Sequence, residues 1–250
     1  MLRIVTLNLN YYVDKHGPWE TRKKLIIDQL QKTDPHIVAF QAVAKDAKLY
    51  DGKDQAFQIC EELSGFQSHY FQEAQTTSEG LQQGSAIISK FHMLDKSFQN
   101  LSLLQGFDDT NKRALLKATF KRPNGTFNFY NAHFSWVHEQ ATKNVEEALQ
   151  FMQKDNAPSL LAGDLNTLSD STAFVPFKQA GMIDAWQQAN GDKEGFTFES
   201  DKPSIRIDYF WISSELAKEL NKVEIISHPQ NSNARLSDHL GLMLELNVKV

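Results

Sequence analysis

Short apolar runs alternate with amphipathic segments along the 250 residues of the chain. The run Ile37–Val43 is apolar at almost every position, which is typical of a strand buried on both faces. In Trp19–Lys32 the apolar side chains recur at helical spacing, and Asp34-Pro35 ends the predicted helix. The pattern predicts further strands at Leu2–Leu7, Ser85–Ile88, Ser97–Leu104, Ala114–Phe120, Phe127–His133, Ser159–Ala162, Ile205–Ile212, Val223–Ser227 and Leu240–Val248, and further helices at Asp54–Leu63, Val137–Lys154 and Ala173–Ala180.

These elements predict one α/β domain that spans residues 1–250. The middle of the chain is mostly strands, and Pro123-Asn124-Gly125 is a strong signal for a hairpin there. The sequence shows no internal repeat, low-complexity tract or linker. Strands and helices that alternate without a strict repeat favour two packed sheets with helices on the outside.

Several predicted strands carry polar side chains, most of them at their ends, that an ordinary core does not contain. Asp208 is the clearest case, because it lies inside the apolar run Ile205–Ile212, where a buried carboxylate needs a partner or a function. Loops at the rim of a rigid sheet commonly carry binding and catalytic residues. The predicted site therefore consists of these polar side chains: Asn8, Asn131, His133, Asp164, Asn166, Asp208, Asp238 and His239.

The residue types in this group point to metal-assisted hydrolysis of a phosphoester. Carboxylate and amide oxygens are hard ligands that suit Mg²⁺ or Mn²⁺ better than zinc. Histidines beside carboxylates supply an acid and a base for proton transfer. A hard cation and amide donors stabilise the charge that develops on phosphoryl oxygens. The group contains no cysteine, and the serines of the chain lack the G-x-S-x-G context of an activated nucleophile.

Each of these residues also has a structural explanation when it is taken alone. Asn8 is a common turn residue after a strand, and His133 is compatible with a hydrogen-bonded histidine in the core. Asp208 has a candidate ion-pair partner in Arg206, which lies on the same face of the predicted strand. The functional interpretation therefore depends on the ordered set and not on any single residue.

The ordered set resembles the endonuclease/exonuclease/phosphatase superfamily, which has the DNase I-like fold. The resemblance covers almost the whole chain, and it implies a four-layer α/β/β/α sandwich of two mixed sheets with the active site at one edge of both sheets. It depends on the order and spacing of six pieces: Thr6-Leu7-Asn8, Phe40-Gln41-Ala42-Val43, Asn131-Ala132-His133, Gly163-Asp164-Leu165-Asn166, Arg206-Ile207-Asp208-Tyr209 and Ser237-Asp238-His239.

The resemblance also implies a role for each site residue. It places two residues beside a divalent ion and assigns the others to the water, the phosphate or the orientation of a neighbour. The implied roles are Asn8 and Asp238 near the metal, Asp164 holding or deprotonating the attacking water, Asn166 binding phosphate oxygens, His133 stabilising the pentacovalent state, Asp208 orienting His133 or Asn166, and His239, oriented by Asp238, acting as base or phosphate ligand.

Three further residues are candidates for substrate contact. Arg113 begins a predicted strand, and its guanidinium matches the geometry of a phosphate group. Trp136 follows the His133 motif closely enough to line a cleft, and Asn131 belongs to that motif. A solvated arginine at a strand end and a packed tryptophan are the structural alternatives.

The chain departs from the family pattern at Ala42. The family's usual metal ligand is a glutamate directly after the glutamine, whereas this chain has Gln41-Ala42-Val43. A methyl group cannot bind a cation, so we expect the metal affinity to fall by orders of magnitude unless another acid replaces the glutamate. Three explanations stay open: an engineered inactivating change, compensation by an acid such as Asp46, Asp54 or Glu79, or a fold that has lost the chemistry.

The charge balance bears on the substrate. The chain has 26 Lys and Arg residues and 31 Asp and Glu residues, so its formal net charge is −5. This charge disfavours binding to a long polyanion such as duplex DNA. We therefore expect a small phosphoester or a nucleotide as substrate. DNA or RNA is the alternative substrate, and a phosphate-binding protein without turnover is the non-enzymatic alternative. Two segments resemble the small bacterial metal-dependent hydrolases of the superfamily more than its DNA-repair branch: Gly17-Pro18-Trp19-Glu20-Thr21-Arg22 and Asn131-Ala132-His133-Phe134-Ser135-Trp136.

Cysteine use and hydropathy bear on the compartment. Cys60 is the only cysteine, which excludes a disulfide within the chain and fits a reducing compartment. No apolar run reaches the roughly 18–20 residues of a membrane span. The first ten residues become polar too early for the core of a signal peptide. We therefore expect a cytoplasmic protein.

Overall fold

The computed structural model describes residues 1–228 and 234–248. Its helices are α1 (Trp19–Thr33), α2 (Gln55–Glu62), α3 (His138–Met152), α4 (Val175–Gln179), α5 (Ala185–Asn190) and α6 (Ser214–Ala217), with short 3-10 turns at Asp14–His16, Tyr50–Gly52 and Thr172–Phe174. Its strands are β1 (Leu2–Asn8), β2 (Ile37–Lys45), β3 (Ser68–Thr76), β4 (Gln82–Ser89), β5 (Asp95–Leu101), β6 (Arg113–Arg122), β7 (Gly125–His133), β8 (Ser159–Asp164), β9 (Ile183–Asp184), β10 (Asp208–Ile212), β11 (Leu220–Ile226) and β12 (Gly241–Leu246).

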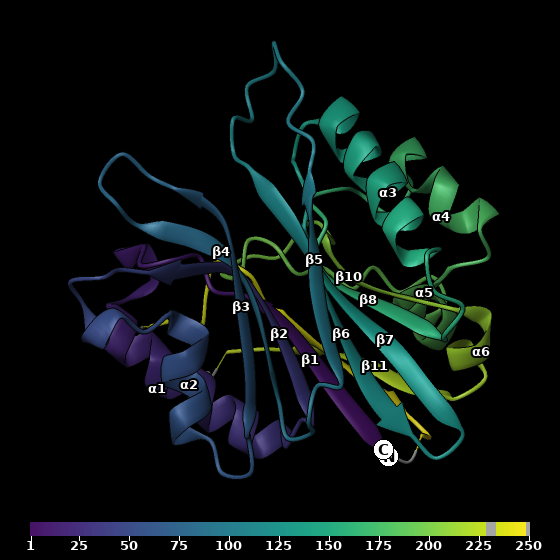
Figure 1. Ribbon diagram of the computed structural model, residues 1–250, viewed down its shortest axis with the longest axis horizontal. Helices are drawn as coiled ribbons and strands as arrows, with labels where there is room; N and C mark the ends of the chain where they lie inside the picture. The colour runs from purple at the N-terminus through teal and green to yellow at the C-terminus, as the bar shows by residue number, and fades with distance from the viewer. Residues whose placement is uncertain (229–233, 249–250) are drawn as a thin grey trace.

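The strands form two mixed sheets of six strands each. The strand order is β11-β12-β1-β2-β4-β3 in the first sheet and β5-β6-β7-β8-β10-β9 in the second. The pairs β1 with β2 and β7 with β8 are parallel, and the other pairs are antiparallel. Figure 1 shows the two sheets side by side in the centre of the molecule.

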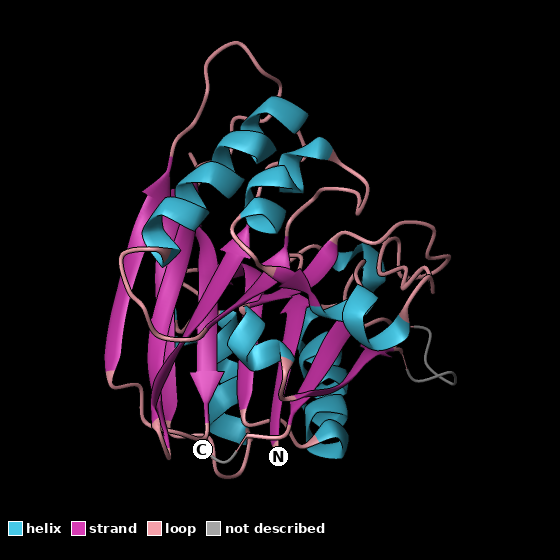
Figure 2. Ribbon diagram, turned by 90° about the vertical axis from the view of Figure 1, so that its right-hand side faces the viewer, coloured by secondary structure: helices cyan, strands magenta, loops and turns pink. Residues whose placement is uncertain are grey.

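Three apolar cores hold the layers together. The largest lies between the sheets and contains Ile4 and Leu244 of the first sheet and Phe129 of the second. A second core packs α1 and α2 against the first sheet, and a third packs α3 and α4 against the second sheet. Figure 2 accordingly shows helices in front of and behind the strands. This arrangement confirms the predicted four-layer α/β/β/α sandwich.

The differences from the predicted elements occur where the apolar pattern is weak. Strand β3 is not predicted, because it lies at the edge of its sheet and its sequence Ser68–Thr76 is mostly polar and half-buried. The short elements β9 and α5 are also not predicted. The predicted helix Ala173–Ala180 is instead a 3-10 turn followed by the five-residue helix α4. Strand β10 begins at Asp208, so the polar residue stands at the end of the strand and not inside it. Among the described residues, no helix is long and apolar enough to cross a membrane.

Candidate active site

Strand ends from both sheets meet at one edge of the sandwich. In the second sheet, Asp164 at the end of β8 lies in register with His133 at the end of β7 and with Asp208 at the start of β10. In the first sheet, Asn8 at the end of β1 lies in register with Gln41 on β2. Parallel strands end at the same edge of a sheet, so polar residues that are far apart in the sequence come together here.

Gly163 allows this close approach of β7 and β8. Its φ of +146° is unfavourable for residues with a side chain, and a Cβ at this position would lie 1.9 Å from the carbonyl oxygen of Ala132. Only glycine therefore fits beside Ala132. This explains why glycine comes directly before Asp164.

Asp164 is the centre of the site. Its Oδ2 atom accepts a hydrogen bond from Nδ2 of Asn8 at 2.8 Å and lies 3.4 Å from Nε2 of His133 and 3.6 Å from Nε2 of His239. Its Oδ1 atom accepts from the backbone N–H of Asn166 at 3.0 Å. Four of the predicted residues thus surround the carboxylate of Asp164, a residue that is only 1% exposed.

His239 forms its closest ion pair with Asp208. Nδ1 of His239 lies 2.9 Å from Oδ2 of Asp208, and both side chains are buried. The sequence predicted that Asp208 orients His133 or Asn166 and that Asp238 orients His239, and the structure corrects both predictions. Successive side chains of an extended segment point in opposite directions, so the neighbour Asp238 turns away and accepts a hydrogen bond from Ser237 instead.

The environment separates the pKa values of these groups. Burial raises the pKa of Asp164 to about 6, against the lowering effect of His239. Burial alone would lower the pKa of His239, but Asp208 and Asp164 outweigh it and raise that pKa to about 10. Burial, with Arg113 and His239, holds the pKa of His133 well below its usual value. At neutral pH the site therefore contains a charged His239 beside a neutral His133.

Asp164, Asp208 and His239 could hold a metal ion. One ligand atom from each of them lies within 4.8 Å of the others. Among the described residues, Oδ1 of Asp208 is a buried oxygen without a hydrogen-bond partner, which is what an atom reserved for a cation requires. Asp238, one of the two predicted ligands, is not in this group of acidic and histidine side chains. Asn8, the other, contacts Asp164 of the group through Nδ2, and its Oδ1 accepts from the N–H of Asn10.

Ala42 lies at an irregularity of β2, where the register with β4 shifts between Phe40 and Val43. The alanine is buried and has a φ of +49°. The three acids that were candidates to replace the missing carboxylate have other surroundings. Asp54 accepts from the N–H of Phe57 and contacts His69, Asp46 accepts from the N–H of Lys48, and Glu79 is exposed on the turn between β3 and β4.

Asn131 does not reach the cleft. It is fully buried between the sheets, where Nδ2 donates to the carbonyl oxygens of Phe40 and Ala86 and Oδ1 accepts from Nε2 of Gln41. All of these partners belong to the opposite sheet. The sequence made Asn131 a candidate for substrate contact, whereas the geometry indicates that it fixes the two sheets relative to each other.

Arg113 lies at the border of the site. Its guanidinium donates to Oδ2 of the buried Asp109 at 2.8 Å and to the carbonyl oxygen of His133 at 3.5 Å. Its Nε atom is buried and has no hydrogen-bond partner among the described residues. Arg113 therefore supplies positive charge next to His133, while its own position is fixed by Asp109.

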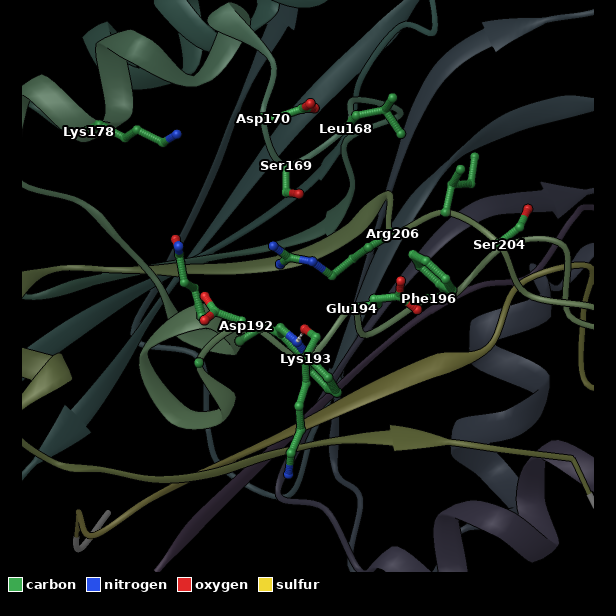
Figure 3. Close-up of a pocket in the computed structure, with 14 residues that line it drawn as sticks. Leu168, Ser169, Asp170, Lys178, Asp192, Lys193, Glu194, Phe196, Ser204 and Arg206 are labelled. Atoms are coloured by element: carbon green, nitrogen blue, oxygen red, sulfur yellow. Dashed lines mark hydrogen bonds between the residues drawn. The ribbon is translucent and has the colours of Figure 1, made fainter.

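Arg206 forms an ion pair with a different residue from the one predicted. Its guanidinium binds both carboxylate oxygens of Asp184, at 3.0 and 2.7 Å, and not Asp208. Arg206 lines a cavity of about 600 Å³, into which its side chain extends in Figure 3. None of the Asp164, Asp208 or His239 side chains lines this cavity, so we place it outside the reactive group.

Trp136 is exposed beside the site. It lines a second cavity, of about 410 Å³, which also includes Asn166. Nδ2 of Asn166 donates to the carbonyl oxygen of Phe134, two residues before Trp136. Trp136 thus lies in the same cavity wall as Asn166, and its contact with a substrate stays a prediction.

Two residues near the site gave no signal in the sequence. Arg22 on α1 is fully buried, and its guanidinium donates to the carbonyl oxygens of Leu9, Val13 and Leu236, so it ties the loop after β1 to the segment before His239. Burial is the main reason why the pKa of Tyr11 is raised, and the nearby carboxylate of Asp164 raises it further. Tyr11 lies in an irregular loop, and Arg22 is one cation on an amphipathic helix, so neither stands out by pattern.

Comparisons with known proteins agree with this geometry. The sequence model of the Endonuclease/Exonuclease/phosphatase family matches residues 5–239. No curated protein matches the chain. Among solved structures, an endonuclease/exonuclease/phosphatase family protein from Leptotrichia buccalis has a TM-score of 0.80 at 19% identity, covering 98% of this chain and 99% of its own.

Two other solved structures carry descriptions of activity. A mannosyl-6-phosphatase from Bacteroides thetaiotaomicron has a TM-score of 0.79 at 20% identity and covers 98% of this chain and 99% of its own. A 3′ phosphatase from Neisseria, solved with a product DNA hairpin, has a TM-score of 0.71 at 17% identity, with coverage of 98% and 99%. At these identities the likeness establishes the fold.

Proposed function

Because the chain belongs to the endonuclease/exonuclease/phosphatase family, we propose that it hydrolyses a phosphoester by attack of water on phosphorus. The observation that carries the proposal is the convergence of Asp164, Asp208 and His239, which brings a base, a charged histidine and candidate metal ligands into one group. Phosphoryl transfer requires these parts: a group that activates water and positive charge on the phosphoryl oxygens.

Asp164 serves as the base that takes the proton of the attacking water. Its raised pKa brings the carboxylate closer to the pH at which it works, which favours proton transfer. Asn8 and the N–H of Asn166 each donate to one of its oxygens and so fix its orientation. Asn8 therefore acts through Asp164 rather than on the substrate.

His239 binds a phosphoryl oxygen as a cation. Asp208 keeps it protonated, and the histidine carries its charge into a buried site where charge is poorly screened. His133 is neutral and lies 3.4 Å from the same Oδ2 atom of Asp164, so it can donate or accept a hydrogen bond without adding a second charge. The side chain of Asn166 is a further donor to phosphoryl oxygens.

A divalent cation fits the carboxylate oxygens of Asp164 and Asp208, and oxygen ligands favour Mg²⁺ or Mn²⁺. His239 could join them as a ligand only after losing the proton on Nε2, so in its charged form it serves the phosphoryl oxygens instead. When bound, the cation supplies positive charge that stabilises the phosphoryl oxygens and lowers the pKa of water. The alanine at position 42 leaves the site without the glutamate of the family pattern, so we expect weaker binding than in relatives that have it.

A small phosphoester is the substrate that these features favour. The net charge of −5 and the absence of a basic groove signal in the sequence argue against a long polyanion. The two structural relatives with described activities are named as phosphatases, one of a mannosyl compound and one bound to DNA. A nuclease is the second candidate, supported by the DNA hairpin in the second of these structures.

An activity panel tests the proposal. The panel contains p-nitrophenyl phosphate, bis-p-nitrophenyl phosphate, a nucleotide and supercoiled or abasic DNA, each with Mg²⁺, with Mn²⁺ and with EDTA. We expect hydrolysis of a small ester that falls by at least about 100-fold in Asp164→Asn. Cleavage of DNA without hydrolysis of any small ester would favour the nuclease. Phosphate binding without any turnover, unchanged in His239→Ala, would favour the non-enzymatic alternative.

A further inference from the structure

The cavity beside Asn166 offers a place for the organic part of the substrate. Its volume of about 410 Å³ falls within the range of roughly 300–1,000 Å³ that is usual for small-molecule sites. Trp136 and Leu168 form part of its wall together with Asp170, Ser171 and Thr172. Asn166, whose N–H donates to Asp164, also lines this cavity, so the cavity lies next to the phosphoryl site.

Two large apolar side chains face this cavity from the surface. Trp136 is 54% exposed, whereas the other three tryptophans of the chain are at most 7% exposed. Leu168 is 49% exposed. Exposed apolar side chains that gather in a hollow next to polar groups are typical of a binding surface.

The backbone around Trp136 is fixed. The N–H of Ser135 donates to Oδ1 of Asn144, and Oγ of Ser135 donates to Asp109 and accepts from the N–H of Val137. Ser135 is itself fully buried. The indole is thus presented to solvent by an ordered segment, which lowers the entropy lost when a ligand packs against it.

The polar groups of the cavity are hydroxyls, one amide, one imidazole and one carboxylate. The hydroxyls belong to Thr167, Ser171 and Thr172, the amide to Asn166, the imidazole to His138 and the carboxylate to Asp170. Among the described residues that line it, none is lysine or arginine, whereas Lys178, Lys193 and Arg206 line the neighbouring larger cavity. Figure 3 shows Asp170 and Leu168 at the border of that larger cavity.

This chemistry selects a neutral ring that has both apolar faces and hydroxyl groups. A second phosphate would meet the carboxylate of Asp170 and neither a lysine nor an arginine among the residues that line this cavity. A sugar ring, in contrast, places its C–H face on the indole and donates its hydroxyls to a carboxylate. We propose that the substrate is a sugar phosphate whose ring lies on Trp136 with its hydroxyls toward Asp170. This inference rests on the proposed function.

The experiment compares esters that differ in the group attached to phosphate. Glucose 6-phosphate, mannose 6-phosphate and ribose 5-phosphate test the sugar ring, glycerol 3-phosphate lacks a ring, and AMP adds a nucleobase. We expect a lower KM for at least one sugar phosphate than for glycerol 3-phosphate. Trp136→Ala should raise that KM roughly 5–100-fold, as expected for the loss of one aromatic contact, with little change in kcat.

A matched control separates this effect from a general one. Phe98 on β5 is another exposed aromatic residue, 44% exposed, and it does not line the cavity. Phe98→Ala should leave every KM unchanged. Trp136→Ala should also leave the KM of glycerol 3-phosphate unchanged, and Asp170→Asn should raise the KM of the sugar phosphate only.

Binding to Asp164→Asn, in which we expect turnover to be at least about 100-fold slower, distinguishes the failure of this inference from the failure of the proposed function. In saturation-transfer NMR the ring protons of glucose 6-phosphate or mannose 6-phosphate should receive saturation, and the signal should disappear in Asp164→Asn/Trp136→Ala. Ring contact without hydrolysis by the wild type would support the sugar site and remove the proposed function. Hydrolysis with a KM that does not depend on Trp136, or a lower KM for AMP alone, would overturn the sugar site.

Discussion

The ion pair of Asp208 and His239 is the interaction on which the electrostatics of the site depend most. Nδ1 and Oδ2 are 2.9 Å apart, and the two side chains are 6% and 1% exposed. Replacing Asp208 by Asn keeps the shape of the side chain and removes its charge. Burial then acts on His239 with only Asp164 and Asp238 to oppose it, so the pKa of His239 should fall from about 10 by two units or more.

The magnitude of this change follows from the pKa difference. One pKa unit corresponds to about 1.36 kcal/mol, so a fall of two units means that the protonated form of His239 loses about 3 kcal/mol of stabilisation relative to the neutral form. We expect kcat/KM for p-nitrophenyl phosphate to fall about 10²–10⁴-fold in Asp208→Asn, because the variant loses a cation at the phosphoryl oxygens and a fixed ring orientation.

The same pair predicts how stability depends on pH. The pKa of His239 is higher in the folded protein than its ordinary value of 6.5. The pair therefore contributes its full stability below about pH 6.5, and this contribution disappears as the pH rises through about 10. In EDTA, the difference in unfolding free energy between wild type and Asp208→Asn should shrink over this interval.

NMR titration of the His239 ring in EDTA and steady-state kinetics are the two assays. Asp54→Asn is a matched control, because Asp54 and His69 form another Asp–His contact, at 3.0 Å, outside the site. The control should lose some stability, since Asp54 also caps α2, but should keep its kcat/KM. A His239 pKa near 6.5 in the wild type, or a kcat/KM in Asp208→Asn within about threefold of wild type, would refute the reasoning.

Three other substitutions test separate parts of the structure. Asn131→Ala removes hydrogen bonds between the sheets and leaves partners such as Gln41 unsatisfied. The free energy of unfolding in urea should therefore fall by about 2–4 kcal/mol, and a fall below about 0.5 kcal/mol would contradict the bridging role of Asn131. Ala42→Glu should raise the affinity for Mn²⁺, measured by titration calorimetry, about tenfold or more, and no gain would show that position 42 does not face the cation. Arg206→Met leaves Asp184 buried without its cation and should cost about 3–5 kcal/mol of stability, whereas unchanged stability would show that the pair contributes nothing.

The sequence was sufficient to predict the layers and most of the site residues. Buried strands such as Ile37–Lys45 are apolar enough to be recognised without further information. Polar residues at the ends of such strands must meet at a sheet edge, which is why Asn8, His133 and Asp164 could be grouped from order alone.

The pairing of side chains within the site could not be predicted in the same way. The sequence places Asp238 next to His239, and the actual partner Asp208 is 31 residues away. Which carboxylate faces a histidine depends on the direction of each side chain, and this is decided by packing. Asn131 was assigned to the substrate for a similar reason, because the sequence does not show that its side chain points between the sheets.

The central claim is that Asp164 directs water onto phosphorus. Hydrolysis of the ester most readily cleaved by the protein, carried out in ¹⁸O-labelled water and followed by ³¹P NMR, tests this most directly. We expect one labelled oxygen in the phosphate that is released, at a rate that falls at least about 100-fold in Asp164→Asn. Label in the alcohol product, or a rate that is the same with and without the Asp164 carboxylate, would contradict it.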